Sequence, residues 1–288
     1  MRRPRKSSDR THRSDVRSLL FSISENGVAL KPSSLGSTMM IVMPSARIDD
    51  DGAPFGTSCK ELRSSLRLGI LLVGISTVAP ACASDAPDPP FADPDLPTVE
   101  TNPDGDRYPT DHLGGRKRTA QRPGDRIPNF TFRAYRKGRE SGLETVSLAE
   151  YYDPHRKRHK LLHIQGAATW CTICSSELEA TVSVAEPLKE RGIVFLEVIV
   201  SGATAGKGPS LSEVDAWIDR HKTNFPTAID VAARRLGAIG MNGAAMPHDI
   251  LIDTRTMEIL DSSVGAPADV GQYVLAGLRF VDENPPAY

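Results

Sequence analysis

The stretch LLHIQGAATWCTIC, residues 161–174, decides the fold of this chain. The apolar residues between Lys160 and Gln165 predict a strand, and Thr172 to Arg191 has the composition of a helix. Cys171 is therefore expected at the amino terminus of that helix, where unpaired N–H groups and the helix dipole favour a thiolate. Cys174 lies one turn further on the same face, within reach to resolve a mixed disulfide.

The sequence on both sides of this stretch alternates between expected strands and helices. The expected strands are 127–134, 193–200, 250–253 and 258–264, and the expected helices are 147–152, 211–222 and 268–281. This alternation predicts an α/β fold with a mixed central sheet and helices on both faces. Pro187 is expected to kink or restart the helix that contains it.

Three segments together carry a resemblance to a known family. WCTIC follows an apolar strand, MPHDILID stands at 246–253, and PGDRIPNFTF stands at 123–132. In these features the chain resembles the thioredoxin-like redoxins of bacterial envelopes, of the TlpA/ResA and AhpC/TSA-related kind, over about residues 122–281. The resemblance implies a thioredoxin-like fold and thiol–disulfide oxidoreductase activity.

The resemblance also implies roles for individual residues. By this similarity Cys171 is the attacking thiol and Cys174 the resolving thiol. Pro247 would be a cis-proline packed beside them, and Met246 would offer its backbone to an extended substrate peptide. Trp170 is expected to shield the nucleophile and support substrate docking. No cofactor beyond the Cys171–Cys174 dithiol is expected.

Two positions depart from the thioredoxin pattern. Thr172 and Ile173 stand between the cysteines where thioredoxins have Gly-Pro, so the redox potential cannot be carried over. Gln165 stands six residues before Cys171, where thioredoxins bury an aspartate, and an amide cannot accept a proton. Glu197, in an expected central strand, is the substitute candidate for a proton relay, against the alternative that it faces water.

Composition and charge argue against other functional classes. Lys and Arg total 35 and Asp and Glu total 36, so the net charge of −1 gives no reason to expect nucleic acid as a partner. No second CxxC exists, and His155, His159 and His163 lack the spacing of zinc ligands, so no metal is expected.

The amino-terminal part predicts export. Residues 1–59 lack an apolar period and are expected to be disordered, or to precede a translation start that lies downstream of Met1. Residues 60–82 combine basic residues with a short apolar run, as in a signal peptide, and the run ends in VAPAC, which resembles a lipobox with Cys82 as the lipidated residue. Plain signal-peptidase cleavage after Ala81 or Ala83 is the alternative. The Pro-rich residues 83–121 are expected to form an extended tether before a domain at 122–288.

The function predicted from these observations is that of an envelope thiol–disulfide oxidoreductase acting on protein disulfides. Its expected partners are a protein thiol or disulfide substrate, an envelope electron donor or acceptor, and the membrane through a lipid at Cys82. A non-catalytic binding module with a structural disulfide is one alternative. A peroxiredoxin-like peroxidase is another, although the sequence before Cys171 lacks the Pro-x-x-x-Thr-x-x-Cys pattern.

Overall fold

A computed structural model describes residues 88–111 and 123–286. Its sheet contains seven strands in the order β2-β1-β5-β4-β3-β6-β7, in which β3, β4 and β5 are parallel. The strands are β1 (Thr131–Tyr135), β2 (Leu143–Ser147), β3 (Leu161–Ala168), β4 (Ile193–Ser201), β5 (Thr227–Ile229), β6 (His248–Asp253) and β7 (Glu258–Val264). The α-helices are α2 (Thr172–Lys189), α3 (Leu211–His221) and α4 (Val270–Glu283), and the 3-10 helices are η2 (Arg139–Ser141), η3 (Leu148–Tyr151), η4 (Val231–Ala233) and η5 (Leu236–Ile239).

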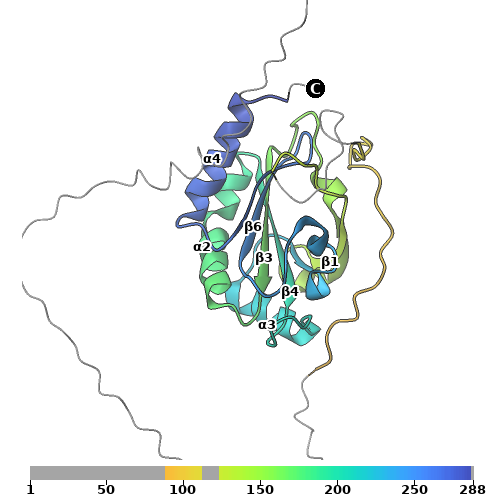
Figure 1. Cartoon of the computed structure of the whole chain (residues 1–288), viewed down its shortest axis with the longest axis vertical. Coiled ribbons are helices and arrows are strands. Elements are labelled where there is room, and N and C mark those ends of the chain that lie inside the picture. The colour runs from red at the N-terminus through yellow and green to blue at the C-terminus, as the bar shows by residue number, and fades with distance from the viewer. Residues whose placement is uncertain (1–87, 112–122, 287–288) are drawn as a thin grey trace, which may run out of the picture. The chain divides into compact units, whose positions relative to one another are not determined.

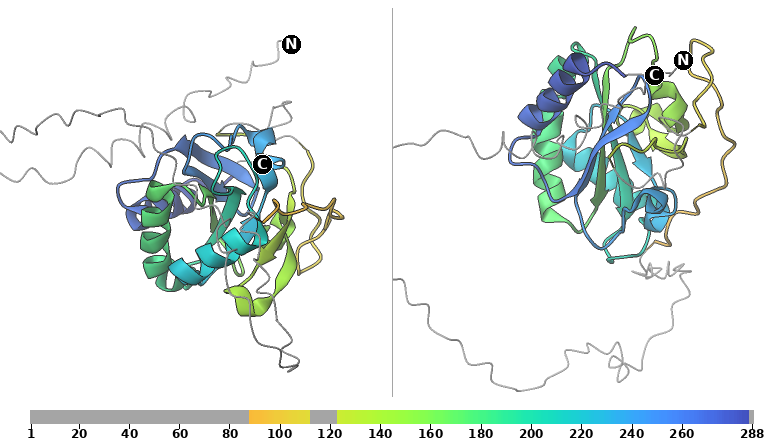
Figure 2. Two further views of the ribbon diagram at one scale, coloured as in Figure 1. Left: turned by 90° about the horizontal axis from the view of Figure 1, so that it is seen from below. Right: turned by 45° about the horizontal axis from the view of Figure 1, so that its top comes forward.

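Helices cover both faces of this mixed sheet, which confirms the predicted thioredoxin-like α/β fold. The three α-helices lie together along one face (Figures 1 and 2). On that face Tyr273 of α4 packs its ring 5.8 Å from His163 of β3, and Trp217 of α3 donates to Glu197 of β4. On the other face the segment around η5 contacts the sheet, with the Arg235 guanidinium 5.7 Å from the ring of Phe132. Parallel β3-α2-β4-α3-β5 connections place both crossover helices on one face, as right-handed crossovers that progress in one direction require.

The apolar composition of the central strands follows from their position in the core. Every residue of β3 and β4 is buried, as expected for parallel strands covered on both faces. The helix α3 begins at a capping box, in which the Ser210 side chain accepts from the backbone of Glu213 and Glu213 accepts from the backbone of Ser210. These local features fix the strand–helix order that carries the two cysteines.

The sequence-based boundaries differ from the structure mainly at short elements. The strand expected at 127–134 begins only at Thr131, and β2 and the three-residue β5 were not predicted. Short strands carry too little periodic signal, because their pairing partners define them. Helix α2 continues through Pro187 to Lys189 as one helix, so the predicted restart is wrong.

Part of the expected tether packs on the domain. Tyr108 is only 4% exposed and donates its hydroxyl to the carbonyl of Ile127 at 2.8 Å. Asp93 pairs with Arg235, and the backbone N–H of Phe91 bonds to the carbonyl of Pro209. Residues 88–111 therefore differ from the predicted extended tether. Isolated aromatic and acidic side chains between the prolines contact the hydrophobic core and the basic residues of the domain.

The predictions for residues 1–59 and 60–82, including Cys82, concern residues outside those that the structure describes. Within the described ranges no helix is both long enough and apolar enough to span a bilayer.

Candidate active site

The two cysteines form a disulfide across the first turn of α2. The sulfur atoms are 2.15 Å apart and the Cα atoms 5.3 Å apart. Cys171 is the N-cap of the helix, and its Sγ accepts the backbone N–H of Cys174 at 3.1 Å. Cys171 is 5% exposed and Cys174 is fully buried. The same N–H and the helix dipole would stabilise a thiolate at Cys171 after reduction, whereas Cys174 lies behind it.

Trp170 is held at the rim of the disulfide by the end of β4. Its indole N–H donates to the hydroxyl of Ser201 at 3.3 Å, and the backbone N–H of Thr169 donates to the Ser201 carbonyl at 3.0 Å. The Trp170 side chain remains 38% exposed. The ring is thus oriented from one side and open to solvent on the other, as the docking role expected from the sequence requires.

The Met246–Pro247 segment lies at the same end of the sheet as the cysteines. Its peptide bond is cis, in agreement with the expectation for Pro247. The next residue, His248, is the register partner of Gly166, which lies near the end of the strand that leads to Cys171. The backbone of Met246 forms no hydrogen bond with any residue that the structure describes.

Two apolar side chains at this end are more exposed than Trp170. Ile173, between the two cysteines, is 57% exposed, and Val264, at the end of β7, is 58% exposed. Val264 is the register partner of His248, directly after Pro247. We call Trp170, Ile173 and Val264 the apolar rim. Large exposed apolar side chains gathered near a reactive group are typical of a protein-docking surface.

A row of buried polar side chains crosses the sheet beneath the α-helices. The register places Thr227 of β5, Glu197 of β4, Gln165 of β3 and Asp249 of β6 side by side. Registered neighbours point to the same face of a sheet, so these four side chains share the face covered by α2 and α3. All four are almost completely buried, and we call them the polar row.

Glu197 is well provided with hydrogen bonds. Its carboxylate accepts from the indole N–H of Trp217 at 2.9 Å and from the Thr227 hydroxyl at 3.4 Å. Burial raises the pKa of Glu197 to about 8, although these two donors lower it. The alternative that Glu197 faces water is therefore wrong. Gln165 lies beside it, and among the described residues its amide makes no hydrogen bond of good geometry, although it lowers the pKa of the nearby Glu177.

The sequence analysis missed an acidic cluster at the other end of the polar row. Glu177 of α2, His163 of β3 and Asp249 of β6 are all buried, and the His163 ring lies 2.7 Å from the Asp249 carboxyl. Among the described residues neither carboxyl oxygen of Glu177 has a partner in good hydrogen-bond geometry, although the Asp249 carboxyl and the Gln165 amide lie near enough to shift its pKa. The available signal was its position three residues after Cys174, which places both on one face of the helix.

Burial decides the protonation of this cluster. It raises the pKa of Glu177 to about 9, with a further increase from the nearby Asp249 carboxyl. It also raises the pKa of Asp249 to about 7 and lowers that of His163 to about 4. At neutral pH Glu177 is therefore protonated beside a neutral imidazole, and Asp249 is divided between its protonated and ionised forms.

The same three residues could hold a metal ion. One ligand atom from each of His163, Glu177 and Asp249 lies within 4.8 Å of the others. An imidazole with two carboxylates is a donor set that suits zinc or a similar divalent ion. Protons neutralise the same charges, and the raised pKa values of both carboxyl groups agree with that state.

Comparisons with known proteins show what this domain resembles. Residues 123–258 match the model of the AhpC/TSA family. We call this part of the chain, after that resemblance, the redoxin domain. The redoxin domain carries the CxxC-spaced disulfide of Cys171 and Cys174. The search of curated proteins gave no match.

Solved structures also resemble the chain at low sequence identity. A putative thiol:disulfide interchange protein DsbE from Chlorobium tepidum is 20% identical, with 55% of this chain and 99% of that chain covered and a TM-score of 0.43. AhpC from Enterococcus faecalis is 17% identical, with 55% and 93% covered and a TM-score of 0.43. An exposed lipoprotein thioredoxin from Streptococcus pneumoniae is 22% identical, with 53% and 98% covered and a TM-score of 0.39.

Proposed function

We propose that the redoxin domain is a thiol–disulfide oxidoreductase that acts on protein disulfides. One observation carries this proposal. The Cys171–Cys174 disulfide spans the first turn of α2, with Cys171 at the helix N-cap and Cys174 buried behind it. This arrangement gives the two sulfurs different tasks, because only Cys171 borders solvent and only Cys174 can reach it from inside.

In the reducing direction the dithiol passes two electrons to the substrate. The Cys171 thiolate attacks one sulfur of a substrate disulfide, which forms a mixed disulfide and releases the first substrate thiolate. Cys174 then loses its proton and attacks the Sγ of Cys171. The second substrate thiolate leaves, and the Cys171–Cys174 disulfide remains. Both substrate thiolates take up protons. The oxidising direction is the same sequence in reverse.

Glu177 is our candidate for the group that handles the proton of Cys174. It lies one turn deeper on α2, and among the described residues it has no hydrogen bond of good geometry, only the Asp249 carboxyl and the Gln165 amide nearby. Asp249 and His163 lie behind it, and the Asp249 pKa near 7 allows the cluster to take up or release a proton at neutral pH. During attack Glu177 would take the Cys174 proton while it passes its own proton to the ionised Asp249 carboxylate, and the reverse transfers would return a proton to Cys174 when Cys174 is the leaving group. Glu197, the sequence-based candidate, is second because Trp217 and Thr227 already occupy its oxygens.

The apolar rim supports a protein as substrate. Trp170, Ile173 and Val264 offer exposed apolar surface around the disulfide. Met246 offers unbonded backbone beside them. An extended peptide that carries a cysteine could bury apolar side chains on the rim and pair with that backbone.

We also propose that the protein works in the cell envelope, anchored through Cys82. The support is the sequence from 60 to 82, a short apolar run that ends in small residues before a cysteine. The native protein should then partition into detergent, and Cys82→Ser should lose this behaviour. A Cys82→Ser protein that still partitions into detergent would remove the anchor.

The Cys174→Ser variant tests the oxidoreductase proposal. It can attack but cannot resolve, so it should accumulate a mixed disulfide with its substrate protein, visible on a non-reducing gel and identifiable by mass spectrometry. Cys171→Ser is the matched control and should trap almost nothing. If neither variant traps a partner and the wild-type disulfide resists exchange with glutathione, the disulfide is structural and the proposal fails. Consumption of hydrogen peroxide by the reduced protein would instead favour the peroxidase alternative.

A further inference from the structure

A cavity of about 400 Å³ lies at the end of the domain opposite the cysteines. It is lined by the beginnings of β4 and β5, the end of α2 and the residues that precede β3. The cysteines follow the carboxyl end of β3, whereas the cavity lies at the amino ends of the parallel strands. The two sites therefore lie at opposite ends of the strands. Glu186 of the lining and Cys171 are separated by roughly 20 Å along α2, at about 1.5 Å per residue.

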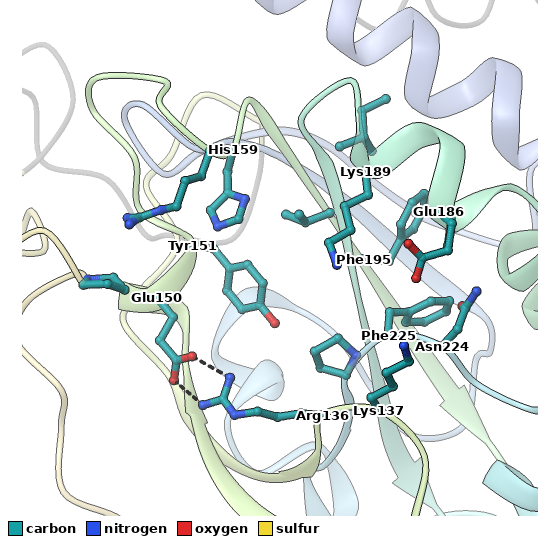
Figure 3. Close-up of a pocket in the computed structure, with 16 residues that line it drawn as sticks. Arg136, Lys137, Glu150, Tyr151, His159, Glu186, Lys189, Phe195, Asn224 and Phe225 are labelled. Atoms are coloured by element: carbon teal, nitrogen blue, oxygen red, sulfur yellow. Dashed lines mark hydrogen bonds and ion pairs between the residues drawn. The ribbon is translucent and has the colours of Figure 1, made fainter. Parts of the chain in front are cut away.

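The walls of the cavity are mainly apolar and aromatic. Phe195 of β4, Phe225 and Pro226 before β5, and Tyr151 of η3 form much of the lining (Figure 3). Cavities of this size with aromatic walls are typical of sites for small organic ligands.

Tyr151 supplies a polar group that lacks a protein partner. Its side chain is more than nine-tenths buried, yet its hydroxyl forms no hydrogen bond with any described residue. Figure 3 shows this hydroxyl pointing into the cavity. The neighbouring His159 likewise has a buried Nδ1 without a partner. Buried polar groups are normally hydrogen-bonded, so an unpaired one that faces a cavity is a feature of a binding site.

The charges on the lining favour an anion. Two of its four cations are already neutralised, because Arg136 pairs with Glu150 and Arg158 pairs with Asp104. Lys137, after β1, and Lys189, at the end of α2, form no ion pair with any described residue. Their amines border the cavity from two different elements. Glu186 is the lining carboxylate that likewise has no ion pair among the described residues. The two unpaired lysines against this one unpaired carboxylate leave an excess of positive charge on the lining.

We propose that this cavity binds a small organic anion with an aromatic or aliphatic body, such as a carboxylate. The apolar body would pack against Phe195, Phe225 and Pro226. The anionic group would accept from the amines of Lys137 and Lys189 and from the Tyr151 hydroxyl. The proposal does not depend on the oxidoreductase function, because the cavity shares no residue with the cysteine site.

Calorimetric titration of the oxidised full-length protein with three probes of one shape tests this site. The probes are 4-phenylbutyrate, its neutral amide 4-phenylbutyramide and the cation 4-phenylbutylamine. The carboxylate should bind at least about tenfold more tightly than the amide, and the amine should bind most weakly. Equal affinities for all three probes, or no binding of the carboxylate at millimolar concentration, would overturn the proposal.

Charge variants locate the binding site. The double variant Lys137→Gln, Lys189→Gln changes two exposed side chains and should lower the carboxylate affinity by about tenfold or more, while the affinity for the amide is unchanged. Lys207→Gln, in the loop after β4 at the cysteine end, is the matched control and should bind like the wild type. Equal loss in the control and the double variant would show non-specific charge attraction and refute the site. Exchange activity measured in the same samples reports separately on the cysteines.

Discussion

Two buried glutamates lie in different settings near the polar row, Glu197 within it next to Thr227 and Glu177 on α2 beside Asp249. Glu197 accepts from Trp217 and Thr227, so its carboxylate is tied to α3 and β5. Glu177 has no hydrogen bond of good geometry among the described residues, and its polar neighbours are the Asp249 carboxyl and the Gln165 amide. Both side chains have pKa values raised by burial, to about 8 and about 9.

This difference indicates that Glu197 has a structural role, whereas Glu177 can exchange its proton. A carboxyl group with fixed donors contributes hydrogen bonds that hold two elements together. A carboxyl group without fixed hydrogen-bond donors, one turn from a buried cysteine, can exchange a proton with the thiol of that cysteine. A raised pKa alone therefore does not identify the group that carries the proton. The hydrogen-bond donors around each carboxyl group distinguish the two candidates.

The largest expected effect is on the pH dependence of stability. Glu177 keeps its proton in the folded protein up to about pH 9, whereas the unfolded chain releases it above its ordinary pKa of 4.5. The unfolding free energy should therefore fall as pH rises through this window. Glu177→Gln removes the titrating group, so it should gain about 2 kcal/mol or more relative to the wild type between pH 5 and pH 8, measured by urea unfolding.

Glu197→Gln is the comparison for this experiment. Glu197 keeps its proton in the folded protein up to about pH 8, so removing it should change the pH dependence of the unfolding free energy in the same direction. The loss of stability due to Glu197 should be complete at a lower pH than the loss due to Glu177. A wild-type protein whose unfolding free energy stays flat from pH 5 to pH 8 would contradict the raised pKa values of both groups.

The next effect concerns thiol–disulfide exchange. If Glu177 handles the Cys174 proton, Glu177→Gln should slow insulin reduction by about tenfold or more at pH 7, and raising the pH should recover part of the rate. Glu197→Gln should change this rate less than about threefold, since Glu197 is held by other donors. Equal slowing by both substitutions would break the distinction between the two acids.

The smallest effect is expected at Thr227. Its hydroxyl lies 3.4 Å from the Glu197 carboxylate, at the long limit of a hydrogen bond. Thr227→Val keeps the shape and should cost less than about 1 kcal/mol in thermal or urea unfolding, because Trp217 still donates to Glu197. A cost as large as that of Trp217→Phe would show that both donors are needed to hold Glu197.

Features with a local signal in the sequence could be predicted before the structure was known. An apolar strand that runs into a helix places Cys171 at an N-cap, and the spacing of three places Cys174 one turn behind it. The long strands β3 and β4 and the helices α2, α3 and α4 were predictable because each carries its own periodic or apolar pattern. The cis-proline before β6 followed from the family resemblance.

Which polar residues are buried together depends on the packing of distant segments and could not be predicted from the sequence. Glu177 stands in the sequence SSELEA beside Glu179, and its spacing of three from Cys174 is a weak local sign that it, and not its exposed neighbour, is buried. Asp249 meets His163 from 86 residues away, through the antiparallel pairing of β6 with β3. The packing of Tyr108 onto the domain and the register of β5 likewise depend on distant partners. Desolvation is a property of the packed neighbourhood, so the pKa values and the proton-handling group could be read only after the chain had folded.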